Sequence, residues 1–235
     1  MRLKHITFTG IDARTDIKAL QEIQKQFPIA EFGVLTSYHW YENGNRYLDP
    51  QIINTLRGAG LHLALHVCGS AAHDAAMGMW NKIRNHTLDC LWLFGRVQIN
   101  VANRTDNPLR LASTYNYKTE LIVQQRPNNT SLYENSRWIG SDEDGGVSML
   151  LDESGGMGID TPIVIYPSYR KIGYAGGINH DNVATKLEYL LRHVRNGDFW
   201  IDMESGVRTN DWFDLDKVYT VLEICQSIID KYKED

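Results

Sequence analysis

The sequence predicts a (β/α)8 barrel, an α/β fold in which eight parallel strands alternate with helices. Short apolar runs separated by segments of helical periodicity carry this prediction, because such alternation is typical of a parallel sheet with helical crossovers. The length agrees, since 235 residues come close to the roughly 250 that eight βα units need. The chain contains no low-complexity linker, so we expect residues 1–235 to form a single domain.

The expected strands are short runs of apolar and β-branched residues, at 5–9, 30–36, 61–67, 96–101, 120–125, 147–152, 171–175 and 198–203. Helices are expected where apolar residues recur every three or four positions, as in 17–27, 183–194 and 215–229. Asn179 and Asp214 precede two of these segments and are candidate N-caps. Residues 126–147 are rich in Asn, Ser, Asp and Gly, which predicts a long loop.

Composition and charge exclude several classes of partner. Apolar residues make up 43% of the chain, charged residues 23%, and the formal net charge is −5. We therefore expect no nucleic-acid partner and no membrane surface, since both favour a broadly basic face. The cysteines at 68, 90 and 225 lack paired spacing, and the first residues contain no apolar leader. These features predict reduced thiols and a cytoplasmic location.

The expected strands alternate apolar and polar residues with a period of two. In 61–68 the odd positions are aliphatic and the even positions are His, Ala, His and Cys, and Val97 and Ile99 alternate with Gln98 and Asn100. In a barrel one face of each strand meets the helices and the other faces the interior. The polar set should therefore reach the carboxyl-terminal mouth through its last members, Thr9, His66, Cys68, Asn100, Asp152 and Glu204.

Two glycine turns follow the last two expected strands. One contains Gly176 and Gly177, and the other contains Ser205 and Gly206. Turns without bulky side chains allow backbone N–H groups to converge on an anion, and barrels often hold phosphate after strands seven and eight. The same glycines would also be needed if they only permitted tight turns. We expect a phosphorylated small molecule as the ligand.

Six motifs in order resemble those of phosphoribosylanthranilate isomerases, which are phosphate-binding (β/α)8 barrels. The matching segments are 9–12 (TGID), 45–50 (NRYLDP), 97–99 (VQI), 150–158 (LLDESGGMG), 175–183 (AGGINHDNV) and 202–207 (DMESGV). The resemblance implies an Amadori-type rearrangement of a phosphoribosyl-amine by general acid–base catalysis, without a cofactor or metal. It implies that Asp152 is the general acid, that Arg46 grips a substrate carboxylate, and that Gly176, Gly177, Ser205 and Gly206 hold the phosphate.

The sequence departs from this family at Thr9, where the family has a catalytic cysteine as the general base. A threonine hydroxyl is far too weak a base at neutral pH. Three replacements are open: Asp12 in the following loop, Cys68 at the end of the third strand, and Glu204 after the eighth. We favour Asp12, then Cys68, whose thiol would need activation by His66 or a cation. Asp12 could also cap the first helix, and Cys68 could be an inert buried thiol.

Two further features of the mouth have open interpretations. His66 and Cys68 stand two residues apart on one strand face and could share a metal with Asp152 or Glu204, but we expect no metal. We instead expect Thr9 and His66 to contact the substrate. The aromatic segment 38–44 could form a lid that excludes water, or it could pack against the barrel rim.

The sequence therefore predicts an isomerase acting on a phosphorylated sugar derivative. The alternative is a catalytically silent barrel that binds a phosphorylated metabolite as a sensor or partner protein. Loss of the base at Thr9 favours the silent barrel, whereas Asp152 and Arg46 favour the enzyme. The oligomeric state is left open.

Overall fold

Eight parallel strands close into a barrel in the computed structural model, which describes residues 2–39, 41, 44–100, 119–125, 147–165, 171–195 and 197–234. The strands are β1 Arg2–Thr9, β2 Ala30–Thr36, β3 Leu63–Val67, β4 Arg96–Ile99, β5 Glu120–Gln125, β6 Val147–Asp152, β7 Lys171–Ala175 and β8 Asp198–Met203. Their order around the barrel follows the sequence, and β1 pairs with both β2 and β8. The predicted (β/α)8 fold is confirmed.

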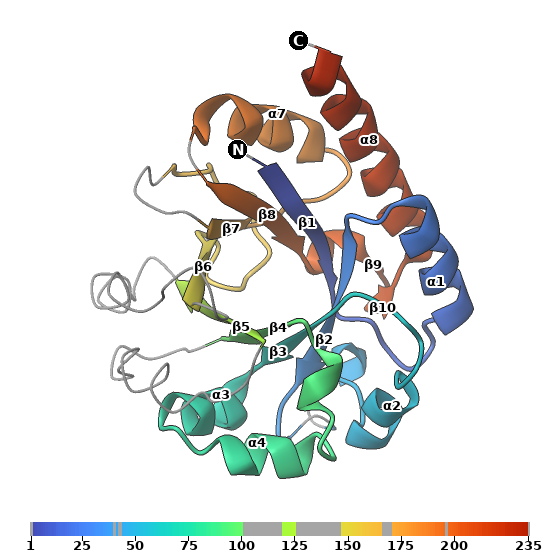
Figure 1. Cartoon of the computed structure of the whole chain (residues 1–235), viewed down its shortest axis with the longest axis vertical. Coiled ribbons are helices and arrows are strands. Elements are labelled where there is room, and N and C mark those ends of the chain that lie inside the picture. Colours follow the sequence, from blue (N-terminus) through green and yellow to red (C-terminus); the bar gives the residue numbers. More distant parts are fainter. Residues whose placement is uncertain are drawn as a thin grey trace.

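Helices surround the strands on the outside of the barrel (Figure 1). They are α1 Ile17–Gln26, α2 Pro50–Thr55, α3 Gly69–Ala76, α4 Trp80–His86, α7 Val183–His193 and α8 Leu215–Glu234, with short 3-10 turns η2 Gly44–Arg46, η3 Leu91–Leu93 and η5 Ser205–Val207. None of the helices in the described ranges is long and apolar enough to cross a membrane.

The apolar stripes predicted these helices because each stripe is the face that covers the barrel. Leu20 and Ile23 of α1 are buried, as are Leu187 and Leu190 of α7. Asp214 caps α8 as predicted, since its Oδ1 accepts from the amides of Asp216 and Lys217.

Asn179 acts one turn before the predicted position. Its Oδ1 accepts from the amides of Asp181 and Asn182, whereas α7 itself begins after Asn182. The side chain therefore stabilises the turn that leads into the helix. The predicted loop at 126–147 lies outside the described residues except for its last residue, which begins β6.

The barrel interior contains a buried ion pair between β2 and β4. Arg96 on β4 donates to both carboxylate oxygens of Glu31 on β2, at 3.0 and 2.7 Å. Thr7 on β1 donates to Glu31 at 2.9 Å. The guanidinium of Arg96 lies 4.4 Å from the ring centre of Trp200. Burial raises and Arg96 lowers the pKa of Glu31, and the net result lies below its ordinary value.

A short hairpin follows β8 and lies at the mouth of the barrel. Its strands are β9 Arg208–Thr209 and β10 Trp212–Phe213, joined through Asn210 and Asp211 with φ of 51° and 61°. Two consecutive residues with positive φ are typical of a type I′ turn, which Asn and Asp tolerate better than most residues. The hairpin therefore brings Arg208 and Asp211 to the rim of the barrel.

Candidate active site

A cavity of about 380 Å³ opens at the carboxyl ends of the barrel strands. This volume is in the range of sites for small metabolites. All six residues predicted to reach the mouth line it: Thr9, His66, Cys68, Asn100, Asp152 and Glu204. The remaining predicted site residues that line it are Arg46, Gly176, Gly177, Ser205 and Gly206. The alternation along the strands thus located the interior face correctly.

Asp202 on β8 is the most unusual group of the cavity. Its side chain is buried, and Thr9 donates its hydroxyl to Asp202 Oδ1 at 2.8 Å. The other oxygen lies 3.8 Å from His66 Nε2. Burial raises the pKa of Asp202 to about 7, against a smaller lowering effect of the Thr9 hydrogen bond. A carboxyl group with such a pKa can accept and release a proton at neutral pH.

Asp152 on β6 is held by three donors. Gln124 donates to Oδ2 at 2.7 Å, and the amide and hydroxyl of Ser154 lie 3.1 and 2.7 Å from Oδ1. The Ser154 hydroxyl also accepts from the amide of Gly158. The carboxyl group is therefore fixed in orientation at the cavity wall.

The glycine turns after β7 and β8 touch each other. A Cβ on Gly206 would lie 2.1 Å from the carbonyl oxygen of Ile178, so only glycine fits there. Gly177 has φ of +62°, and a Cβ on it would lie 2.3 Å from the backbone nitrogen of Asp160. Residues of both turns line the cavity, and backbone amides of such turns can donate to an anion. A larger residue at Gly177 would therefore clash with the backbone at Asp160.

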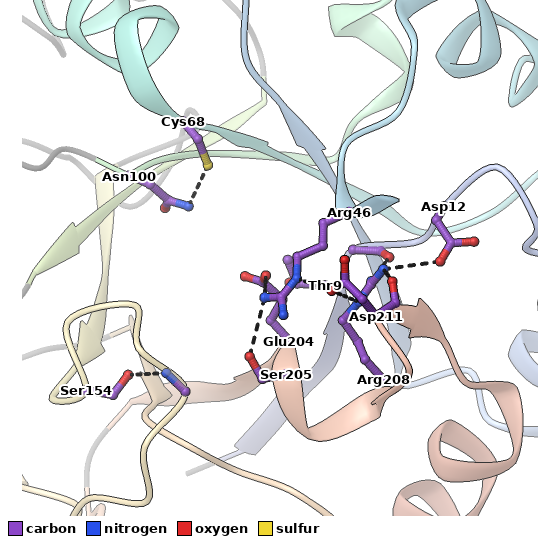
Figure 2. Close-up of polar contacts among 12 residues, drawn as sticks. Thr9, Asp12, Arg46, Cys68, Asn100, Ser154, Glu204, Ser205, Arg208 and Asp211 are labelled. Atoms are coloured by element: carbon purple, nitrogen blue, oxygen red, sulfur yellow. Dashed lines mark hydrogen bonds and ion pairs between the residues drawn. The ribbon is translucent and has the colours of Figure 1, made fainter. Parts of the chain in front are cut away.

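Arg46 is engaged by acidic side chains rather than free. Its Nη1 donates to Glu204 Oε1 at 2.8 Å and its Nε to Asp211 Oδ1 at 2.7 Å. Figure 2 shows this guanidinium reaching across the mouth toward Glu204 and Ser205. Its side chain is 35% exposed. The two carboxylates offset its charge, so Arg46 does not present an unopposed cation to a ligand.

Asp12 does not line the cavity, although it was the favoured base. Its Oδ2 accepts from the amide of Phe213 at 2.6 Å and from Arg208 at 3.3 Å, as Figure 2 shows for Arg208. Its Oδ1 accepts from Arg14 and Thr15. Asp12 therefore joins the loop after β1 to the hairpin. The N-cap of α1 is Asp16, so Asp12 is not that cap either.

Cys68 follows β3 and lies next to Asn100, which follows β4. Figure 2 shows both on the other side of the mouth from Glu204. Asn100 Nδ2 donates to the sulfur of Cys68 at 3.2 Å. Burial and the neighbouring Cys68 raise the pKa of the Tyr47 hydroxyl. Within the described ranges, no three His, Cys, Asp or Glu side chains gather as metal ligands would.

Asp202 is a site residue that the sequence did not single out, although a signal for it was present. The signal was its even position on the eighth strand, two residues before Glu204. Its proximity to Thr9 arises only because β8 pairs with β1, with Thr7 opposite Asp202 in the register. The proposed lid at 38–44 cannot be followed as a unit, because residues 40, 42 and 43 lie outside the described part of the chain.

The fold and the cavity define a closed (β/α)8 barrel with polar groups at its carboxyl-terminal mouth. Comparison with protein-family models and with curated proteins found no match. Among solved structures, the chain is similar to N-(5'-phosphoribosyl)anthranilate isomerase from Pyrococcus furiosus, with a TM-score of 0.60, 15% identity, and coverage of 95% of this chain and 98% of that chain.

A second similar structure is phosphoribosyl anthranilate isomerase from Thermococcus kodakaraensis. The TM-score is 0.58 at 14% identity, with 94% of this chain and 98% of that chain covered. At such identities the likeness establishes the fold: this chain has the barrel of phosphoribosylanthranilate isomerases over nearly its whole length. The residues of the cavity must carry any argument about function.

Proposed function

We propose that the chain is an isomerase of a phosphorylated sugar derivative that works by general acid–base catalysis. One observation carries the proposal: Thr9 donates to Asp202, a buried carboxyl group that lines the same cavity as Asp152. Thr9 cannot act as a base, but its partner can. The pKa of Asp202, about 7, suits a base that operates at neutral pH.

The proposed reaction is the rearrangement of a 5-phosphoribosyl-amine, and its protons balance. Asp152 gives a proton to the ring oxygen, the C1–O bond breaks with its electron pair going to that oxygen, and an iminium forms at C1. Asp202 then takes the C2 proton, and the C2–H electrons form the C1=C2 bond while the iminium pair returns to nitrogen. The enol-amine product is an isomer of the substrate, and it tautomerises to the ketone.

The proposed phosphate end of the substrate lies at the glycine turns. Gly177, Ile178 and Gly206 line the cavity, and the contact of Gly206 with Ile178 brings their two turns together. Backbone amides supply hydrogen-bond donors to an anion without a mobile side chain. This arrangement supports a phosphate at one end of the cavity, with the sugar between Asp152 and Asp202.

The amine part of the substrate is proposed to be uncharged or cationic. The acidic side chains that line the cavity are Asp152, Asp202 and Glu204, and Arg46 already faces Glu204 at 2.8 Å. A second substrate anion would have to displace Glu204 or remain beside it, and a like charge at such a distance is unfavourable. This revises the role of Arg46, which the family resemblance assigns to a substrate carboxylate.

The test is turnover of phosphoribosyl-amines formed in solution from ribose 5-phosphate and an amine. We expect the ketose product with aniline and less with 2-aminobenzoate. Asp202→Asn and Asp152→Asn should each lower turnover by about 10²–10⁴-fold, since neither amide can exchange a proton. Asp12→Asn is the matched control and should keep kcat. Unchanged turnover in Asp202→Asn would contradict the assignment of the base.

A catalytically silent barrel is the second candidate, and the threonine at position 9 favours it. This candidate predicts ligand binding without turnover. Tight binding of ribulose 5-phosphate, with no ketose formed from any amine in the panel, would replace the isomerase by a binding protein. Restored turnover in Thr9→Cys would instead favour an isomerase geometry that has lost its base.

A further inference from the structure

His66 on β3 is a buried side chain of the cavity wall whose two ring nitrogens have different surroundings. Its Nδ1 lies 3.1 Å from Gln98 Nε2 on the neighbouring strand β4. Its Nε2 has no hydrogen-bond partner among the described residues, and it lies 3.8 Å from Asp202 Oδ2. The imidazole is 2% exposed. An unpartnered polar atom at such burial requires an explanation.

The contacts of Gln98 determine which nitrogen of His66 carries the proton. Gln98 Nε2 donates one hydrogen to Asn100 Oδ1 at 2.9 Å. The amide nitrogen of Asn100 in turn donates to Cys68 Sγ at 3.2 Å. The same Gln98 Nε2 lies 3.1 Å from His66 Nδ1. Since an amide nitrogen only donates, Nδ1 accepts, and the proton of a neutral imidazole must be on Nε2.

The ring is neutral at physiological pH. Burial lowers the pKa of His66 to about 3, against an opposing effect of Glu31 and with a smaller contribution from Arg96 in the same direction. His66 therefore presents one N–H, on Nε2, next to the carboxyl group of Asp202. A buried donor without an acceptor is destabilising by roughly 1–3 kcal/mol. A ligand oxygen at this position would remove that penalty.

We infer that His66 donates its Nε2–H to the hydroxyl oxygen on C2 of the sugar, next to the proton that Asp202 removes. The inference rests on the proposed function and adds the group that orients the reacting carbon. His66 keeps its proton throughout, so the proton balance is unchanged. A neutral donor is required, because an imidazolium beside Asp202 would hold that carboxylate as an ion pair and weaken it as a base.

The first experiment measures the tautomer directly. In the ¹⁵N spectrum of the protein, His66 should show a protonated Nε2 and an unprotonated Nδ1 at neutral pH, with its signals identified by their loss in His66→Phe. Gln98→Met should abolish this preference without touching the imidazole. A proton on Nδ1, or a doubly protonated ring, in the unmodified protein would overturn the inference.

The second experiment uses two probes that differ only in the C2 oxygen. Ribose 5-phosphate should bind about tenfold more tightly than 2-deoxyribose 5-phosphate, as expected for one hydrogen bond to a buried donor. This ratio should vanish in His66→Phe and persist in His66→Gln, whose amide still donates. Ribose 5-phosphate should also shift the His66 Nε2 signal.

The outcomes separate the inference from the proposed function. If both probes bind the unmodified protein equally and leave the His66 signals in place, the role of His66 is overturned while phosphate-sugar binding stands. If neither probe binds, the proposed function is overturned and the inference falls with it. If His66→Phe does not fold, the loss of the signals in His66→Gln identifies them instead, and the tautomer measurement in the unmodified protein and in Gln98→Met still decides.

Discussion

Two buried carboxyl groups inside the barrel differ in one partner. Each accepts a hydrogen bond from a threonine hydroxyl of β1. Thr7 donates to Glu31 at 2.9 Å, and Thr9 donates to Asp202 at 2.8 Å. Glu31 also accepts from Nε and Nη2 of Arg96, at 3.0 and 2.7 Å. The pKa of Glu31 is lowered, whereas that of Asp202 is raised to about 7.

Two neighbouring threonines of β1 thus have different surroundings, one next to a stabilising ion pair and the other in the candidate active site. Two residues before the end of β1, Thr7 contacts the ion pair of Glu31 and Arg96, in which each charge faces an opposite charge. Two residues further along, Thr9 belongs to a pair in which desolvation is not offset by a cation in hydrogen-bond contact with Asp202 among the described residues. Desolvation without a counter-charge is what makes a carboxyl group titrate near neutrality.

The largest expected effect is on stability and concerns the ion pair of Glu31 and Arg96. Arg96→Met should lower the free energy of unfolding by about 3–5 kcal/mol, because it leaves Glu31 buried without its counter-charge. Denaturant unfolding measures the change. The double variant Arg96→Met/Glu31→Gln is the matched control and should recover much of the loss. A loss in the double variant as large as in Arg96→Met would show that the contact with Trp200, not the charge, matters.

Asp12→Asn should have the next largest effect, and it tests the contact between the loop after β1 and the hairpin of β9 and β10. Asp12 accepts from Phe213 and Arg208, so we expect a loss of about 1.5–3 kcal/mol in unfolding free energy. Below its melting temperature the variant should retain kcat, because Asp12 does not line the cavity. A collapse of kcat at unchanged stability would restore Asp12 as the base.

Asp202→Asn should change the pH dependence of stability. The folded pKa of about 7 lies above the ordinary value of 3.8, so the folded state binds more protons between these values. The contribution of Asp202 is thus fully present below about pH 3.8 and is lost as the pH rises through 7. The variant should lack this loss, measured as unfolding free energy at a series of pH values.

His66 changes the unfolding free energy with pH in the opposite direction, so its effect must be separated from that of Asp202. Its folded pKa of about 3 lies below the ordinary 6.5, so its contribution is lost as the pH falls below 6.5. The informative quantity is therefore the difference between the unmodified protein and Asp202→Asn at each pH. If this difference does not vary between pH 4 and 8, the carboxyl group does not titrate there.

Glu204→Gln should give the smallest effect, on ligand preference. Arg46 would lose one of its two acidic partners, so affinity for a sugar phosphate carrying an arylcarboxylate should rise by up to about tenfold, while that for the aryl analogue changes little. Calorimetric titration with a matched pair of 1-arylamino-1-deoxyribitol 5-phosphates measures both. Asp211→Asn is the comparison. Equal affinities before and after would indicate that Glu204 does not control this preference.

The sequence was most informative where a local pattern decides the outcome. Alternation in 61–68 predicted that His66 and Cys68 face the interior, and both line the cavity. It was least informative where a side chain meets a distant partner. Asp12 looked like a mouth carboxylate because it follows the first strand by three residues, yet its partners come from the hairpin after β8.

The (β/α)8 fold could be predicted from local patterns, because strand and helix periodicities depend on side chains only a few positions apart. The same patterns predicted which face of each strand lines the interior. The partners of the buried carboxyl groups depend instead on contacts between distant strands. Thr9 and Asp202 stand 193 positions apart and meet because β1 and β8 close the barrel. Which buried carboxyl group gains an arginine, and which gains only a hydroxyl, is decided by that closure.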